Sequence, residues 1–334
     1  MPLITEKQAV LKVYENAAER KWVIPTFCSE NLTTTEAIMQ AVSEYGQEIG
    51  QENLPVTIAI TNLYEHRSQS VMYTQTRRWD IGLKLFLNDI KVLTDPRSPF
   101  EHLQVMTHLD HVQPELDVEL LEWDLTDFSS IMYDASAFPW NDNLKKTSNF
   151  VQRRSKEIVI EGACDEIVDA TGAERSNLTS PGKAEEYIKA TGVDFMVANL
   201  GTEHRANAAD LEYRGDIARK IKKRIGAKMV LHGCSSVPHW QLGNLFSDGV
   251  CKVNIWTALE RDSSPVLFED MIRHAEQAAG TKMVEKLIKD GYLTVKNATG
   301  HNFDLKYFTT AYRQSIVFEE MKKVVKSFLK IWYK

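Results

Sequence analysis

The segment QVMTHLDHVQPELDVELLE, residues 104–122, contains one complete unit of the expected fold. Residues 104–109 form a short apolar run, which is typical of a strand buried on both faces of a parallel sheet. Asp110 and His111 stand where this strand would end, and residues 114–122 have the apolar spacing of an amphipathic helix. The segment therefore predicts a strand, a polar strand end and a helix, in that order.

The same unit recurs along the chain. Eight apolar runs are each followed by a helical pattern, and the runs are residues 22–27, 56–61, 104–109, 129–133, 157–161, 194–200, 228–232 and 250–255. The helical segments are residues 34–45, 80–93, 114–122, 141–153, 182–190, 211–225, 238–246 and 258–279. Eight alternations predict an α/β fold of the (β/α)8 TIM-barrel type. The length of 334 residues suits one barrel of about 250 residues with additional segments. A doubly wound open sheet shares the alternation, but no GxGxxG follows the first run.

Additions are expected at both ends of the barrel. Residues 6–20 predict an extra N-terminal helix that closes the lower mouth. Residues 307–332 carry apolar side chains at helical spacing and predict a long terminal helix. We therefore expect a catalytic barrel over residues 1–280 and a C-terminal helical extension over residues 281–334. The extension is expected to pack on the barrel or on a second subunit.

Composition excludes several classes of partner. The net charge is −6, and the one basic run is residues 219–224. This run lies on a predicted helix whose buried face is formed by Ile217, Ile221 and Ile225. The basic residues therefore predict a solvated helix surface rather than a nucleic-acid site. No apolar run approaches the roughly 18 residues that cross a bilayer. The four cysteines form no CxxC pair and the first residues have no apolar signal core. We expect a cytoplasmic protein without disulfides.

Three histidines stand at predicted strand ends. His111, His204 and His232 follow the third, sixth and seventh runs. Catalytic groups of such barrels gather at the C-terminal ends of the strands. A lone histidine there is most often an ordinary polar residue, but three beside acids favour a zinc site with an open fourth position. The sequence therefore predicts a catalytic Zn²⁺ held by these three side chains.

Asp110 precedes the first of these histidines. A carboxylate at the mouth can act as general acid and base toward a substrate oxygen. The alternative is that Asp110 only orients a neighbouring histidine. Both roles place this carboxylate next to the metal.

Several motifs occur together in one order and spacing. They are IPTF at 24–27 followed by Asn31, THLDH at 107–111, IMYDAS at 131–136, TGVDFMVANLGTEH at 191–204, VLHGCSS at 230–236 and KVNIWTALE at 252–260. Over about residues 5–275 the chain resembles the class II, zinc-dependent ketose-bisphosphate aldolases, which include the fructose and tagatose enzymes.

The resemblance implies retro-aldol cleavage of a ketose phosphate or related anionic keto-sugar through a zinc-stabilised enediolate. It assigns acid and base catalysis to Asp110, contact with the enediolate to Asn254, and the zinc to the three histidines named above. It places Asn31 at the substrate. It also implies that Gly233, Ser235 and Thr257 line the phosphate pocket. A monovalent cation is a further candidate ligand near this phosphate site. A homodimer or higher homo-oligomer is expected.

The chain departs from the family pattern at the substrate end. Ala163 stands where the family usually has a second glutamate at the end of strand five. The glycine-rich loop that carries a catalytic glutamate in the family is shortened here. Glu166 or Glu174 is a candidate to replace that catalytic glutamate, on the basis of position alone. Arg205 stands where the family has a glycine, and Cys28 where it has an asparagine. Arg205 is expected either to bind the substrate anion with its planar guanidinium or to turn outward and pair with an acid on the rim.

Alternative functions use the same scaffold. An epimerase or another lyase could proceed through the same enediolate. A catalytically silent barrel used for binding or assembly would explain the shortened glutamate loop. A zinc hydrolase is less favoured because the first predicted strand lacks a His-x-His motif.

Overall fold

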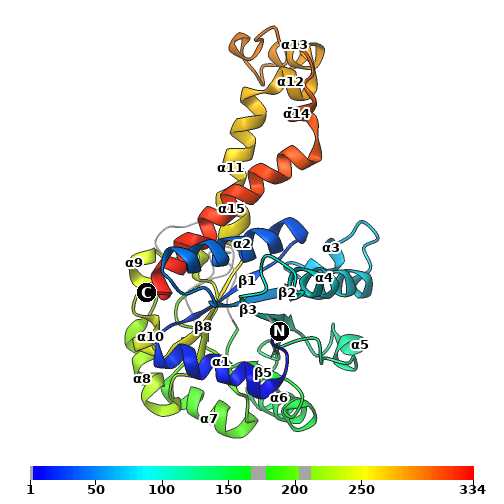
Figure 1. Cartoon of the computed structure of the whole chain (residues 1–334). Helices are drawn as coiled ribbons and strands as arrows, with labels where there is room; N and C mark the ends of the chain where they lie inside the picture. Colours follow the sequence, from blue (N-terminus) through cyan, green and yellow to red (C-terminus); the bar gives the residue numbers. More distant parts are fainter. Residues whose placement is uncertain (1–2, 167–177, 203–211) are drawn as a thin grey trace.

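The computed structural model describes residues 3–166, 178–202 and 212–334. Its strands form a closed parallel barrel in which each strand pairs with the next along the chain and β8 pairs with β1 (Figure 1). The strands are β1 (Ile24–Cys28), β2 (Pro55–Thr61), β3 (Gln104–Val112), β4 (Ser130–Tyr133), β5 (Val159–Ala163), β6 (Phe195–Val197), β7 (Met229–Leu231) and β8 (Val250–Ile255). The expected (β/α)8 barrel is confirmed.

The strand lengths differ from the apolar runs at the mouth. β6 is shorter than its run because the chain already turns at Asn199, whose Oδ1 accepts a hydrogen bond from Gly201 N at 3.1 Å. β3 is longer than its run and includes Asp110 and His111. The sequence therefore located these strands well, but the closure of the barrel set where each one ends.

Helices cover the outside of the barrel. They are α2 (Leu32–Glu48), α3 (Gln69–Met72), α4 (Trp79–Leu93), α5 (Val118–Leu121), α6 (Trp140–Arg154), α7 (Pro181–Thr191), α8 (Gly215–Ile225), α9 (His239–Leu242) and α10 (Leu245–Asp248). The predicted helix 238–246 is divided between α9 and α10, and the helix predicted at 114–122 is only the single turn α5. The buried apolar side chains of strands and helices form one continuous core.

Helix α1 (Lys7–Glu19) closes the N-terminal mouth, as residues 6–20 predicted. Lys7 Nζ forms an ion pair with Asp194 at 2.7 Å, and the Tyr14 ring packs on Phe195 with centroids 4.6 Å apart. Both partners lie at the start of β6. Helix α1 therefore covers this mouth and leaves the opposite, C-terminal mouth uncovered by it.

The C-terminal helices form an extension that projects from the barrel and returns to it (Figure 1). α11 (Thr257–Arg273) leaves the mouth, and α12 (Ala275–Ala279), α13 (Thr281–Lys289), η2 (Val295–Asn297) and α14 (Leu305–Phe308) lie at its far end. The long α15 (Thr310–Trp332) returns beside α11 and packs on α2, where Lys322 and Lys326 pair with Glu44 at 2.9 and 2.6 Å. In the described part of the chain, no helix combines the length and hydropathy that a membrane span requires.

Candidate active site

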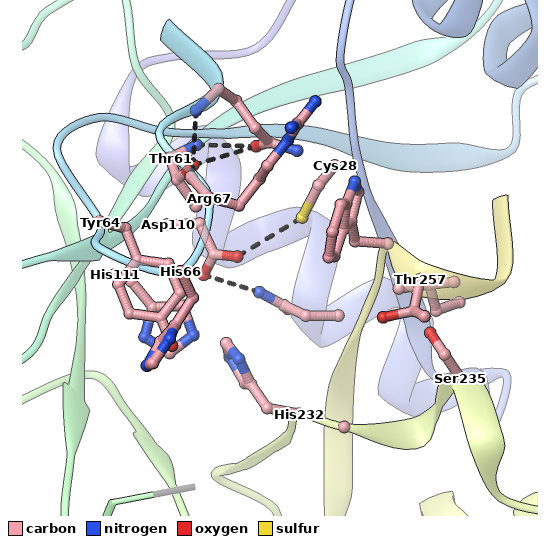
Figure 2. A pocket seen from close by; sticks show the side chains of 15 residues that line it. Cys28, Thr61, Tyr64, His66, Arg67, Asp110, His111, His232, Ser235 and Thr257 are labelled. Carbon is pink, nitrogen blue, oxygen red and sulfur yellow. Dashed lines mark hydrogen bonds between the residues drawn. The ribbon is translucent and has the colours of Figure 1, made fainter. Parts of the chain in front are cut away.

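A pocket opens at the C-terminal mouth, among the ends of β1, β2, β3, β7 and β8 (Figure 2). The space among these strand ends is about 570 Å³, part of which is open to solvent. The lining residues are Cys28, Thr61, Tyr64, His66, Arg67, Gln69, Asp110, His111, His232, Gly233, Ser235, Asn254, Ile255, Trp256 and Thr257. Polar side chains from distant parts of the chain thus meet in one cavity.

Two of the predicted metal ligands and Asp110 come together in this pocket. Asp110, His111 and His232 are all buried, and each offers a ligand atom within 4.8 Å of the other two. The rings of His111 and His232 meet edge to face, with centroids 5.0 Å apart. Nitrogen and carboxylate donors at this spacing fit a zinc ion. His204, the third predicted ligand, lies outside the described residues.

A local irregularity of β3 lets neighbouring residues reach the same cavity. Pairing between β3 and β4 shifts register between Leu109 and Val112, as in a β-bulge. His111 adopts φ 47°, a left-handed conformation that is uncommon for a residue other than glycine. Because the regular alternation breaks here, Asp110 and His111 both line the pocket.

His111 is held in a defined orientation. Its Nδ1 lies 2.8 Å from Asp134 Oδ2 after β4, and the Tyr64 ring stacks on the imidazole with centroids 4.4 Å apart. Ser136 Oγ donates to the other oxygen of Asp134 at 2.6 Å. Burial raises the pKa of Asp134, but the hydrogen bonds from His111 and Ser136 outweigh it and the pKa is lowered. A carboxylate on Nδ1 leaves Nε2 for a metal, as in many carboxylate–histidine–zinc sites.

Asp110 lies at the centre of a hydrogen-bond network that crosses the barrel. Its Oδ1 accepts from Asn254 Nδ2 of β8 at 3.0 Å, and its Oδ2 accepts from Cys28 Sγ of β1 at 3.4 Å. Burial raises the pKa of Asp110, yet the electrostatic interactions with His111 and His232 and a hydrogen bond from His108 outweigh it and hold the pKa well below its usual value. The carboxylate is therefore ionised at neutral pH.

Charged groups continue into the barrel interior below Asp110. His108 Nε2 lies 3.6 Å from Asp110 and 3.7 Å from Glu161, and Lys252 Nζ pairs with Glu161 at 2.6 Å. All three side chains below the aspartate are fully buried. Sequence reasoning did not identify His108 and Lys252 as part of the site. Lys252 could have been found, because a lysine inside an apolar strand run is unusual.

The predicted phosphate-pocket residues lie on the β7 and β8 side. Gly233, with φ 67°, starts the short turn η1 (Cys234–Ser236), and Thr257 is the first residue of α11. Ser235 and Thr257 lie near each other in Figure 2, and Arg261 Nη2 donates to the Ser235 carbonyl at 3.1 Å. Free N–H groups at a helix start favour an anion. This side of the pocket thus offers donors to a phosphate.

Other predicted residues fall elsewhere. Asn31 does not line the pocket, and its Oδ1 caps α2 by accepting from Thr34 N at 3.2 Å. Glu174 and Arg205 lie outside the described residues. Glu166 is the last described residue before a gap, and its carbonyl accepts from Asn199 Nδ2 at 3.1 Å.

The loop after β2 supplies pocket residues that sequence reasoning missed. Tyr64, His66 and Arg67 follow β2 directly and line the cavity, and Trp256 after β8 joins them. The strand-end rule that located the histidines could have found them, because all four follow the ends of predicted strands.

Comparisons with known proteins agree with this geometry. A sequence model of the class-II fructose-bisphosphate aldolase family matches residues 8–331. The fructose-bisphosphate aldolase of Treponema pallidum is 27% identical over 286 residues, which cover 73% of this chain and 80% of that protein.

Solved structures share the fold. The fructose-bisphosphate aldolase of Campylobacter jejuni superposes with a TM-score of 0.76 at 18% identity, over 99% of this chain and 95% of that one. The YdjI aldolase of Escherichia coli K12 gives 0.66 at 17% identity, over 96% and 95%. Because the family match spans nearly the whole chain, this protein belongs to the class II fructose-bisphosphate aldolase family.

Proposed function

We propose that the protein is a zinc-dependent aldolase that cleaves a ketose phosphate or a related anionic keto-sugar by retro-aldol chemistry. The observation that carries this proposal is the buried cluster of Asp110, His111 and His232, whose ligand atoms lie within 4.8 Å of one another at the barrel mouth. A bound zinc supplies Lewis acidity for the substrate ketone and for the enediolate that cleavage produces. His204 is proposed as the remaining ligand.

Asp110 is proposed to remove the proton from the hydroxyl group on the carbon that becomes the aldehyde. Its lowered pKa keeps it ionised, and the hydrogen bond from Asn254 fixes its orientation. Asn254 Oδ1 has no hydrogen-bond partner within the described residues, so it can accept from a substrate hydroxyl. The carbon left by cleavage needs a second acid, a role that we propose for Glu174 or Glu166.

The anionic end of the substrate is proposed to bind between Gly233, Ser235 and Thr257. Their position at the start of α11 and at a left-handed glycine provides backbone donors for a phosphate, and a monovalent cation could share this position. Arg205 is proposed to add a guanidinium to the same anion, and Asn31 to support the adjoining loop.

Assembly and location complete the proposal. We propose a cytoplasmic homodimer or higher homo-oligomer. All four cysteines are free and buried, which suits a reducing compartment. Large apolar side chains of the extension, such as Phe268 and Tyr292, are 68% and 79% exposed, which supports a contact with a second copy.

The function is tested with the zinc-loaded protein and a panel of keto-sugar phosphates. We expect release of a triose phosphate, followed with a coupled dehydrogenase. The Asp110→Ala protein, loaded with the same metal, is the control for contaminating aldolase. Absence of any cleavage by the metal-loaded wild-type chain across the panel would reject the proposal.

A further inference from the structure

The wall of the pocket on the β2 side contains an arginine whose charge is already neutralised. Arg67 lines the cavity, and its Nε lies 3.0 and 3.1 Å from the two carboxylate oxygens of Glu30, while its Nη2 also donates to Glu30. Glu30 is only 7% exposed. The guanidinium and the carboxylate therefore form a planar, bidentate pair with no net charge.

Other pocket residues bind the same carboxylate. Trp256 Nε1 donates to Glu30 Oε1 at 2.8 Å, and Gln69 Nε2 donates to the same oxygen at 3.0 Å. The Arg67 guanidinium lies over the Trp256 ring, 5.8 Å from its centroid. These contacts fix the orientation of Arg67, and its Nη1 makes no hydrogen bond with the described residues, so that N–H group remains available to a ligand.

A second carboxylate lies behind this wall. Glu260, one turn into α11, has a buried Oε1 without a hydrogen-bond partner among the described residues. Burial, and then the charge of Glu30, raise the pKa of Glu260 to about 7, while Arg67 opposes the shift. When Glu260 is ionised, one guanidinium faces two carboxylates, so this region has a net negative charge.

The two ends of the pocket therefore differ in charge. Ser235 and Thr257 offer hydroxyl groups and the start of a long helix to an anion, whereas the charge of Arg67 is already neutralised by Glu30. Figure 2 shows Arg67 on a different side of the cavity from Ser235 and Thr257. A phosphate at the Arg67 end would meet the charge of the Glu30 carboxylate that already pairs with the guanidinium, while a neutral hydroxyl could accept from Arg67 Nη1 without that repulsion.

We propose that the Arg67–Glu30 pair binds the uncharged, hydroxyl-bearing end of the substrate, so that the enzyme cleaves a keto-sugar with one anionic group and releases an aldehyde without a phosphate. This inference rests on the proposed aldolase function and specifies its substrate class. Arg67 is then a specificity-determining residue that contacts the half of the sugar distant from the phosphate.

Binding to the zinc-loaded Asp110→Ala protein tests the proposal without turnover. Isothermal titration calorimetry at pH 8 compares the 1-phosphates of fructose and tagatose with the matched 1,6-bisphosphates. We expect the preferred monophosphate to bind at least about ten-fold more tightly than its bisphosphate. Equal or tighter binding of the bisphosphates would overturn the inference.

Two changes in the same background identify the residues responsible. Glu30→Gln frees the charge of the Arg67 guanidinium and is expected to reduce the preference for the monophosphate several-fold by improving bisphosphate binding. The double change Arg67→Met with Glu30→Gln removes the pair without leaving a buried charge, and is expected to weaken monophosphate binding about ten-fold with unchanged zinc content. Arg97→Met, at an exposed arginine outside the pocket, is the matched control. Unchanged monophosphate affinity in the double variant would overturn the role of Arg67.

Activity of the wild-type chain separates the two proposals. If the zinc-loaded protein cleaves bisphosphates as efficiently as monophosphates, the aldolase function stands and the inference fails. If it cleaves no keto-sugar phosphate at all, the aldolase function fails, and the inference fails with it.

Discussion

The metal side and the Arg67 wall of the pocket are built in different ways. On the metal side, His111 and Asp110 belong to β3, Asn254 belongs to β8, and Asp134 directly follows β4. On the wall, Glu30 lies on the loop after β1 and Arg67 on the loop after β2, and the two form an ion pair that Trp256 and Gln69 also contact. The difference indicates that the candidate metal ligands and Asp110 are positioned by the rigid sheet, while Arg67 and Glu30 sit on loops that can change without disturbing the barrel.

The strongest test of the metal side is His232→Ala. Removal of one of three proposed imidazole ligands is expected to abolish stoichiometric zinc binding and with it nearly all aldolase activity, because the ion loses an inner ligand. Metal analysis of the purified protein, beside circular dichroism for folding, measures this. Full zinc retention would show that His232 is not a ligand.

Asp110→Ala is the next largest change. Loss of a general acid and base typically lowers the rate by about 10²- to 10⁴-fold, and we expect a decrease of kcat in this range. Zinc content should stay at the wild-type level if Asp110 acts on the substrate, and should fall if it is a ligand. Activity within a few-fold of wild type would limit Asp110 to orienting its neighbours.

Asp134→Asn is expected to affect the metal site indirectly, because Asp134 contacts the proposed ligand His111. The amide keeps the shape but loses the charge that orients His111, and such partners are worth about 10- to 100-fold in metal affinity or activity. Competition with a zinc chelator gives the affinity. Zinc affinity equal to that of the wild-type protein would mean that the Asp134–His111 contact of 2.8 Å does not stabilise the bound metal.

The smallest effect is expected on the wall, from the pH dependence of stability. The pKa of Glu260 is raised to about 7 in the folded chain from an ordinary value of 4.5, so the folded state holds the proton more firmly than the unfolded state. Its contribution to the free energy of unfolding is therefore fully present below pH 4.5 and is lost as the pH rises through about 7, by roughly 3 kcal/mol in total.

Glu260→Gln should remove the pH-dependent contribution of Glu260 to the free energy of unfolding. The difference in unfolding free energy between the variant and the wild type should therefore change between pH 5 and pH 8. Denaturant unfolding of both proteins at pH 5 and pH 8 measures it. An equal difference at the two pH values would show that the pKa of Glu260 is not raised.

The sequence alone determined the barrel and predicted several of the polar residues that line the pocket. Alternating apolar runs and helical patterns are local properties, so they identified the eight strands, and the rule that chemistry lies at strand ends then pointed to Asp110, His111, His232 and Asn254. The family motifs added roles for these residues and for Ser235 and Thr257, which line the same pocket.

Tertiary structure alone decided which distant side chains meet. The hydrogen bond between Asp110 and Asn254 joins residues 144 positions apart, and it forms only because the barrel closes β8 onto β1. The bulge that turns both Asp110 and His111 toward the pocket depends on pairing with β4. Likewise, no local pattern shows that Glu30 would bind Arg67 and Trp256, or that Asn31 would cap α2 instead of lining the pocket. Periodicity specifies elements because it is repeated along the chain, whereas a single contact between loops depends on the position of every element between them.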